Sequence, residues 1–259
     1  MVFDGKQEKQ AYGSSWAQQA DGYFSDPEMA RDYLVAIMRV ISDATPTSIA
    51  DLGGGTGFIF EQLIEAGIPE NIRLVVIDES EEQLSQCLHS RIMPMKGGFQ
   101  SFSRSEVVDE SGKLMVISRS VLQYAGFKGQ KPWLNHVRGQ MQSGEWFVHQ
   151  SGCTEDLFFS QEINRLFEAM NVDKWVPNYE AFENLLHNAR FEVIESFTVH
   201  SVGMASEELI VRYGVSRDNI EKIKVALRSS CAHRPDIVVF PPTGFIFNFP
   251  YRVLLCRAV

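Results

Sequence analysis

A glycine-rich turn is the part of the sequence whose residue types most clearly predict chemistry. The run from Gly53 to Gly57 reads GGGTG and stands between two apolar segments. Because glycine has no Cβ, a ligand can approach the backbone of such a turn closely. Where a helix follows the turn, its first N–H groups can bind a carboxylate or a phosphate. The turn therefore predicts a site for a ligand that carries negative oxygens.

An acidic residue further along the chain restricts the class of ligand that this turn can bind. Asp78 lies 25 residues after Gly53, at the end of the next apolar segment. An acid in that position of an α/β fold accepts hydrogen bonds from ribose hydroxyls. The dinucleotide fingerprint G-x-G-x-x-G/A does not fit, because Phe58 and Phe60 occupy the positions that need Gly or Ala. The two features together predict a ribose-containing ligand that is not a dinucleotide.

Two strands and a helix must position these residues. Residues 48–52 and 73–77 are short apolar strands, and a helix begins at Phe58 and ends near Gly67 and Pro69. Nearly continuous apolar strands are typical of a parallel sheet that is covered on both faces. Strand, helix and strand in this order predict a βαβ unit. Further strands are predicted at residues 95–102, 113–118, 146–149, 191–200 and 251–258, and further helices at 27–42, 179–189 and 217–230.

The turn and the segments after it resemble a known family. The run from Asp51 to Gly57 reads D-x-G-x-G-x-G and is similar to motif I of the class I S-adenosylmethionine-dependent methyltransferases. Asp78-Glu79-Ser80 and residues 113–122 resemble the motifs that follow it in that family. The resemblance implies an α/β, Rossmann-like, doubly wound sheet of seven mostly parallel strands with an antiparallel last strand. It implies one domain over residues 1–259, formed by an N-terminal helical lid segment (1–44), a cofactor-binding core (45–200 and 246–259) and an insertion before the last strand (201–245).

The same resemblance implies S-adenosylmethionine as cofactor and S-adenosylhomocysteine as product. The glycine turn would line the methionine part of the cofactor, Asp78 would bind its ribose, and Ser118 would lie near the sulfonium. The family often has an Asp after the third strand that contacts the adenine, where this chain has Phe99 and Gln100. The predicted cofactor-binding residues are Asp51, Gly53, Gly54, Gly55, Gly57, Asp78, Glu79, Phe99, Gln100 and Ser118.

Methyl transfer needs placement more than protein chemistry, because the cofactor carries the reactive carbon. A base can still remove the acceptor's proton. His149, at the predicted end of the fifth strand, is the predicted base, and His200 is the second histidine to test. No pair of histidines has metal-ligand spacing, so no metal is expected. The predicted substrate-binding residues are the aromatic side chains Tyr12, Trp16, Tyr23, Tyr124 and Trp146.

Composition restricts the partners. The 33 acidic and 24 basic residues leave a net charge of −9, whereas nucleic-acid binding needs a basic face. No apolar run approaches the ~20 residues that span a bilayer. The four cysteines match no C-x-x-C pattern, and the first ten residues are polar. We expect a cytoplasmic protein with a small-molecule substrate and neither a nucleic-acid nor a membrane partner; a homodimer stays open.

Several functions remain open at this point. The acceptor atom can be oxygen, nitrogen or carbon, and specialised or secondary metabolism is the expected setting. The same fold can use S-adenosylmethionine without methyl transfer, as a cyclase-like enzyme, or can hold it as a regulatory protein. Residues 1–25 form a polar segment with interspersed aromatic residues, which predicts a lid over the substrate.

Overall fold

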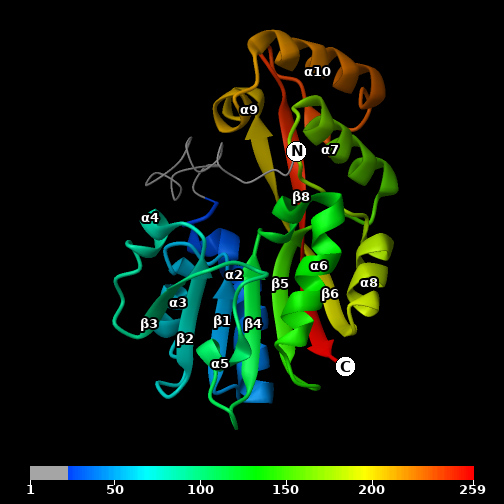
Figure 1. The fold of residues 1–259 in the computed structure, drawn as a ribbon. Coiled ribbons are helices and arrows are strands. Elements are labelled where there is room, and N and C mark those ends of the chain that lie inside the picture. Colours follow the sequence, from blue (N-terminus) through cyan, green and yellow to red (C-terminus); the bar gives the residue numbers. More distant parts are fainter. Residues whose placement is uncertain (1–22) are drawn as a thin grey trace.

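One mixed sheet organises the molecule, in a computed structural model that describes residues 23–259 (Figure 1). The strand order is β3-β2-β1-β4-β5-β8-β6, and the short β7 pairs with β8. The first five strands are parallel, whereas β8 is antiparallel to both β5 and β6. The strands are β1 (Ser48–Leu52), β2 (Arg73–Asp78), β3 (Ile92–Lys96), β4 (Leu114–Arg119), β5 (Trp146–Gly152), β6 (Phe191–Ala205), β7 (Val238–Val239) and β8 (Ile246–Ala258). The predicted sheet with an antiparallel last strand is confirmed, with β7 as an additional eighth strand.

Helices cover both faces of this sheet. Successive strand residues point to opposite faces, so Ile49 packs in one apolar cluster and Ala50 in another. The cluster that contains Ile49 also includes side chains of α2 (Pro27–Ala44), α3 (Phe58–Glu65) and α4 (Glu81–Leu84). The opposite face is covered by α5 (Arg104–Val107), α6 (Gly126–Gly139) and α8 (Tyr179–Asn188). The 3-10 helix η3 (Leu122–Ala125) follows β4 at the carboxyl end of the sheet.

The insertion is built on two strands that are longer than predicted. β6 and β8 extend past the other strands and remain paired as far as Ala205 and Ile246, beside α9 and α10 (Figure 1). In the sequence, Pro250 indicates that the last strand starts at residue 251. In the structure Pro250 lies within β8, opposite the register shift of β6 between Val199 and Val202, where proline is tolerated. A third apolar cluster joins this extension to α7 (Leu157–Ala169), α9 (Ser206–Tyr213) and α10 (Arg217–Ser230), whose bounds match the predicted helix.

The third strand lies earlier in the chain than predicted. β3 covers Ile92–Lys96 and ends before Gly97 and Gly98, whereas the prediction placed it at residues 95–102. Pro94 argues against a strand in the sequence, but β3 is the edge of the sheet, where a missing N–H donor is tolerated. The residues predicted to end this strand, Phe99 and Gln100, therefore belong to the loop after it.

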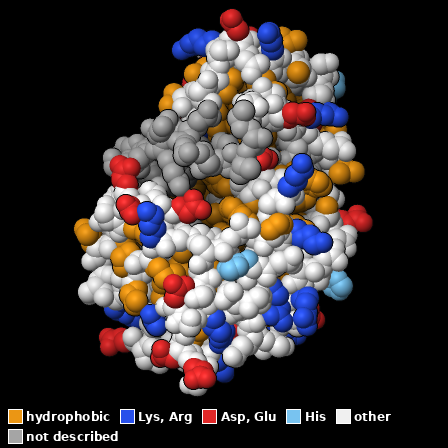
Figure 2. All heavy atoms as spheres, viewed as in Figure 1, with side chains coloured by type: hydrophobic (Ala, Val, Ile, Leu, Met, Phe, Trp, Pro, Cys, Tyr) orange, Lys and Arg blue, Asp and Glu red, His pale blue; other side chains and the backbone are white. Residues whose placement is uncertain are grey.

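The surface carries charges of both signs. Acidic and basic side chains are interspersed over the face shown in Figure 2. Among residues 23–259, every helix is too short or too polar to cross a membrane.

Candidate functional site

The glycine turn lies at the carboxyl ends of β1 and β2. Gly53 has a φ of 74°, and a Cβ on it would lie 2.5 Å from a methyl group of Val121. Both facts require glycine, because other residues rarely adopt this φ and none would fit. The Asp78 carboxylate fixes the turn by accepting hydrogen bonds from the Gly55 N–H (3.0 Å) and the Ser80 N–H (2.8 Å). The predicted glycine turn and its acid thus form one structural unit.

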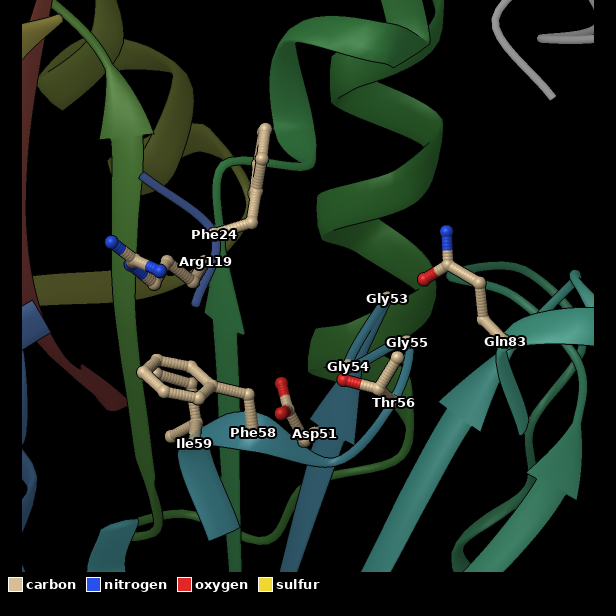
Figure 3. Close-up of a pocket in the computed structure, with 10 residues that line it drawn as sticks. All are labelled: Phe24, Asp51, Gly53, Gly54, Gly55, Thr56, Phe58, Ile59, Gln83 and Arg119. Carbon is tan, nitrogen blue, oxygen red and sulfur yellow. The ribbon is translucent and has the colours of Figure 1, made fainter. Parts of the chain in front are cut away.

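A pocket opens beside this turn, and we call it the glycine-turn pocket (Figure 3). Its empty space, including the open mouth, is about 500 Å³. The Asp51 carboxylate points into it, between the glycine turn and the side chain of Phe58 (Figure 3). The residues that line it are Phe24, Asp51, Gly53, Gly54, Gly55, Thr56, Phe58, Ile59, Gln83 and Arg119.

Asp51 is the acid of this pocket. Its side chain is only 1% exposed, and its Oδ2 has no hydrogen-bond partner in the described part of the chain. Burial and the nearby Asp78 charge raise the pKa of the Asp51 carboxyl to about 7, although Arg119 opposes this shift. A buried carboxylate is stable only when it is paired or hydrogen-bonded. The site is therefore suited to a ligand that brings a cation or a strong donor to Asp51.

Arg119 supplies the opposite charge. It ends β4 and is 8% exposed, and its Nη2 donates to the Tyr23 carbonyl (2.9 Å). Its guanidinium carbon lies 4.3 Å from the centre of the Tyr23 ring. Its Nε has no partner among residues 23–259. The pocket therefore contains one buried acceptor on Asp51 and one buried donor on Arg119, which together suit the ammonium and carboxylate of an α-amino acid.

Strand alternation explains why Arg119 and not Ser118 faces this pocket. Asp51 and Arg119 point to the α2 side of the sheet, together with Ile49 and Ile117. Ser118 points to the other side, and its Oγ donates to the Leu52 carbonyl (3.0 Å). The Ser118 side chain therefore faces away from the glycine-turn pocket, and its predicted place near the sulfonium stays a prediction.

The loop after β3 holds two other predicted residues, and a third, Glu79, directly follows β2 and lies against this loop. Phe99 is buried and stacks on Trp133 with ring centres 4.9 Å apart, whereas Gln100 is exposed. Glu79 lies against Gly98, because a Cβ on that glycine would be 2.8 Å from its Oε1. Their roles in cofactor binding stay predictions.

His149 does not fit the predicted role of a base. Its ring is fully buried, stacked on Phe147 (4.4 Å) and edge-on to Phe182 (5.6 Å), on the face covered by α8. Burial lowers the pKa of His149 to about 3. The strand continues to Gly152, so His149 lies inside it rather than at its end. A side chain enclosed in this aromatic core cannot reach a substrate.

The predicted aromatic residues are separated by the fold. Trp146 begins β5 at the amino end of the strand, opposite to the end where the glycine turn lies, and its predicted substrate role stays a prediction. Tyr23 and Tyr124 lie at the carboxyl end of the sheet, where Tyr23 Oη bonds with Ser120 Oγ (2.8 Å) and accepts from Gln150 Nε2 (2.6 Å). Tyr12 and Trp16, and most of the predicted lid, lie outside the described residues.

Six lining residues are outside the list of predicted site residues, although Thr56 lies within the predicted glycine turn; Arg119 also has a signal in the sequence. A charged residue that directly follows an apolar strand core, as in Leu114–Arg119, stands at the ligand end of a parallel sheet. Gln83 has no such signal, because only the folded α4 brings its Oε1 to within 2.4 Å of where a Gly55 Cβ would lie. The others are Phe24, Thr56, Phe58 and Ile59.

Comparisons with known proteins identify the fold. The sequence matches no protein-family model and no curated protein. Among solved structures, YcgJ from Bacillus subtilis is similar with a TM-score of 0.66 and 12% identity, over 88% of this chain and 98% of that one. The N-methyltransferase NodS from Bradyrhizobium japonicum, solved with S-adenosylhomocysteine, has a TM-score of 0.55 and 12% identity over 98% of this chain and 96% of its own.

A further similar structure is the magnesium protoporphyrin IX methyltransferase ChlM from Synechocystis, also with bound S-adenosylhomocysteine. Its TM-score is 0.55, with 10% identity over 98% of this chain and 94% of that one. The strand order and the antiparallel β8 agree with these similarities along nearly the whole chain. This chain therefore has the fold of the class I S-adenosylmethionine-dependent methyltransferases.

Proposed function

We propose that this protein transfers a methyl group from S-adenosylmethionine to a small-molecule acceptor. One observation carries the proposal: Asp51 Oδ2 and Arg119 Nε are buried, have no partner in the described part of the chain, and line the same pocket beside the glycine turn. The amino-acid end of S-adenosylmethionine carries the two complementary charges. The proposal thus assigns a partner to each of two polar atoms whose burial is otherwise unfavourable.

The remaining residues fit the rest of this cofactor. Asp51 would hold the ammonium and Arg119 the carboxylate, while Asp78, at the end of β2, would bind the ribose hydroxyls. Gly54 leaves room for this, because a Cβ on it would lie 2.6 Å from Asp51 Oδ2. The wall formed by Phe58 and Ile59 supplies apolar surface beside the polar end.

The bound cofactor would supply a methyl carbon made electrophilic by a positive sulfur. The chain's own residues would bind the cofactor, orient it toward the acceptor and restrict water, which is where much of the rate of such a transfer arises. Since His149 is enclosed in the core, we assign no general base. An unprotonated amine or an ionised oxygen attacks without one, and a proton left on the methylated atom is released to water.

A small-molecule acceptor is supported by charge and by the similar structures. The net charge of −9 disfavours nucleic acid, and the similar structures include NodS, an N-methyltransferase, and ChlM, which is named for a porphyrin. A cyclase-like or regulatory use of the same cofactor is the alternative, and the experiment separates it from methyl transfer.

The test has two steps. Calorimetry measures binding of S-adenosylmethionine and S-adenosylhomocysteine to the wild type, to Asp51→Asn and to the control Asp109→Asn, which alters an exposed acid in the same way. Methyl-labelled S-adenosylmethionine is then incubated with the protein and the small-molecule fraction of a cell extract. We expect binding that only Asp51→Asn impairs, and label in a small molecule. Lack of binding refutes the proposal, and binding with all label left in the cofactor supports the alternative.

A further inference from the structure

A second pocket lies at the same end of the sheet, where the insertion meets the core. Its empty space is about 340 Å³, including its mouth. We call it the second pocket, and it is lined by Gln123, Gly152, Phe167, Lys174, Val176, Met204, Arg212, Tyr213, Phe249, Pro250 and Tyr251. These residues come from η3, β5, β6, β8, α7, α9 and the segment after α7. Only the folded chain brings them together.

Two buried cations line this pocket. Lys174 is 7% exposed, and its Nζ donates to Tyr213 Oη (2.8 Å) and lies 3.8 Å from the centre of the Tyr124 ring. Arg212 is 5% exposed, and its Nη2 donates to the hydroxyl of the same Tyr124 (3.0 Å). The tyrosine thus holds both cations on one side of the pocket. Charges with so little exposure attract a carboxylate more strongly than surface charges do.

A buried acceptor lies in the same wall. The Gln123 Nε2 donates to the Ser120 carbonyl (2.7 Å), which fixes the orientation of the amide. Its Oε1 is buried and has no hydrogen-bond partner within residues 23–259. An amide oxygen can accept only from a donor such as a hydroxyl or an ammonium. The pocket therefore combines two positive groups with one acceptor.

One tyrosine separates the two pockets. The Tyr23 ring lies 4.3 Å from the guanidinium carbon of Arg119, which lines the glycine-turn pocket. The same ring stacks on Tyr251, which lines the second pocket, with centres 5.3 Å apart. A ligand of the second pocket therefore lies one aromatic ring away from the amino-acid end of the proposed cofactor site.

We propose that the second pocket binds the methyl acceptor, and that this acceptor is a small carboxylic acid that also carries a hydroxyl or amino group. Lys174 and Arg212 bind the carboxylate, and Gln123 Oε1 accepts from the hydroxyl or amino group. This inference rests on the proposed function, because it identifies the pocket as the acceptor site. It names a chemical class that the glycine turn leaves open.

The experiment uses acids and their uncharged counterparts as probes. Binding of 4-hydroxybenzoate, L-tyrosine and L-serine is compared with that of their methyl esters, with S-adenosylhomocysteine present and absent. We expect at least one acid to bind 10-fold more tightly than its ester. Lys174→Gln and Arg212→Gln are expected to remove this preference, whereas Lys222→Gln, which changes an exposed lysine on α10, retains it. If no acid is preferred, or if the preference survives both variants, the inference is wrong.

Two further measurements keep the outcome interpretable. Gln123→Leu should weaken 4-hydroxybenzoate binding several-fold and leave benzoate, which lacks the hydroxyl, unchanged; equal effects on both acids contradict the role of Gln123. Unchanged S-adenosylhomocysteine affinity and melting temperature in the lysine and arginine variants show that they are folded. Asp51→Asn should lose S-adenosylhomocysteine but keep the acid preference measured in its absence, so failure of either proposal is recognised independently of the other.

Discussion

The two pockets lie on either side of Tyr23 and differ in charge. The glycine-turn pocket pairs one buried acid, Asp51, with one buried arginine, Arg119. The second pocket has two buried cations, Lys174 and Arg212, beside an amide acceptor. The first arrangement suits a ligand end that carries both charges, and the second suits an anion. Adjacent sites of different charge would keep cofactor and acceptor from exchanging places, which is a form of specificity that uses repulsion as well as attraction.

The largest expected effect is the loss of cofactor affinity when Asp51, in the glycine-turn pocket, is replaced. Asp51→Asn removes the charge that would pair with the cofactor's ammonium, and losing one partner of a buried charge pair costs about 3–5 kcal/mol. We expect S-adenosylhomocysteine to bind roughly 100- to 4,000-fold more weakly at pH 8, which calorimetry measures. Asp109→Asn should leave the affinity unchanged. Weakening of less than about 3-fold would remove Asp51 from the site.

The same variant should stabilise the empty protein above neutral pH. The pKa of Asp51 is raised to about 7, mainly by burial, so the folded state binds a proton that the unfolded state has already lost. Stability from this proton is complete below about pH 4 and is lost as pH rises through about 7. We expect Asp51→Asn to be about 4 kcal/mol more stable than the wild type at pH 8, with little difference at pH 4, in urea unfolding. A pH-independent difference would contradict the raised pKa.

His149 lies in the core on the α8 side of the sheet and lines neither pocket. Burial lowers its pKa to about 3, so the unfolded chain takes up a proton that the folded core excludes. The stability of the neutral ring is therefore present above about pH 6.5 and is lost as pH falls toward 3. Between pH 6.5 and 5 the wild type should lose about 2 kcal/mol that His149→Phe does not lose. Unfolding at both pH values measures this, and unchanged S-adenosylhomocysteine affinity in the variant separates a core residue from a site residue.

The glycine-turn pocket was largely predictable because its parts are close along the chain. Strand ends, glycines and an acid occur within residues 48–78, and parallel strands bring their carboxyl ends together whatever the rest of the fold does. The prediction of site residues failed where the end of a strand was placed too early. The side chains of successive strand residues point to opposite faces, so an error of one residue selects a side chain on the wrong face. The predicted end of β4 was Ser118, whereas the strand ends at Arg119, which lines the glycine-turn pocket. The predicted end of β5 was His149, whereas the strand continues to Gly152 and His149 lies in the core.

The second pocket could not be predicted, because no local pattern encodes it. Gln123 and Tyr251 are more than a hundred residues apart, and they meet only because β8 inserts between β5 and β6. The insertion's helix at Arg217–Ser230 was visible from its spacing, whereas α9, which carries Arg212, was not. Lys174 and Arg212 look like surface charges in the sequence, since most residues of these types are exposed. Only their burial identifies them.

The smallest expected effect on stability and affinity comes from changing Tyr23, whose ring lies between the two pockets. Tyr23→Phe keeps the ring between Arg119 and Tyr251 but removes the hydroxyl that bonds with Ser120 and Gln150. Loss of a buried hydrogen-bonding group costs about 1 kcal/mol, so we expect a small fall in stability by urea unfolding and less than 3-fold change in either ligand's affinity. Tyr23→Ala removes the partition itself and should weaken the preference of each pocket for its own ligand, measured as the affinity of each probe with the other present. If Tyr23→Ala behaves like Tyr23→Phe, the ring does not separate the sites, and the difference in charge between the pockets must do so alone.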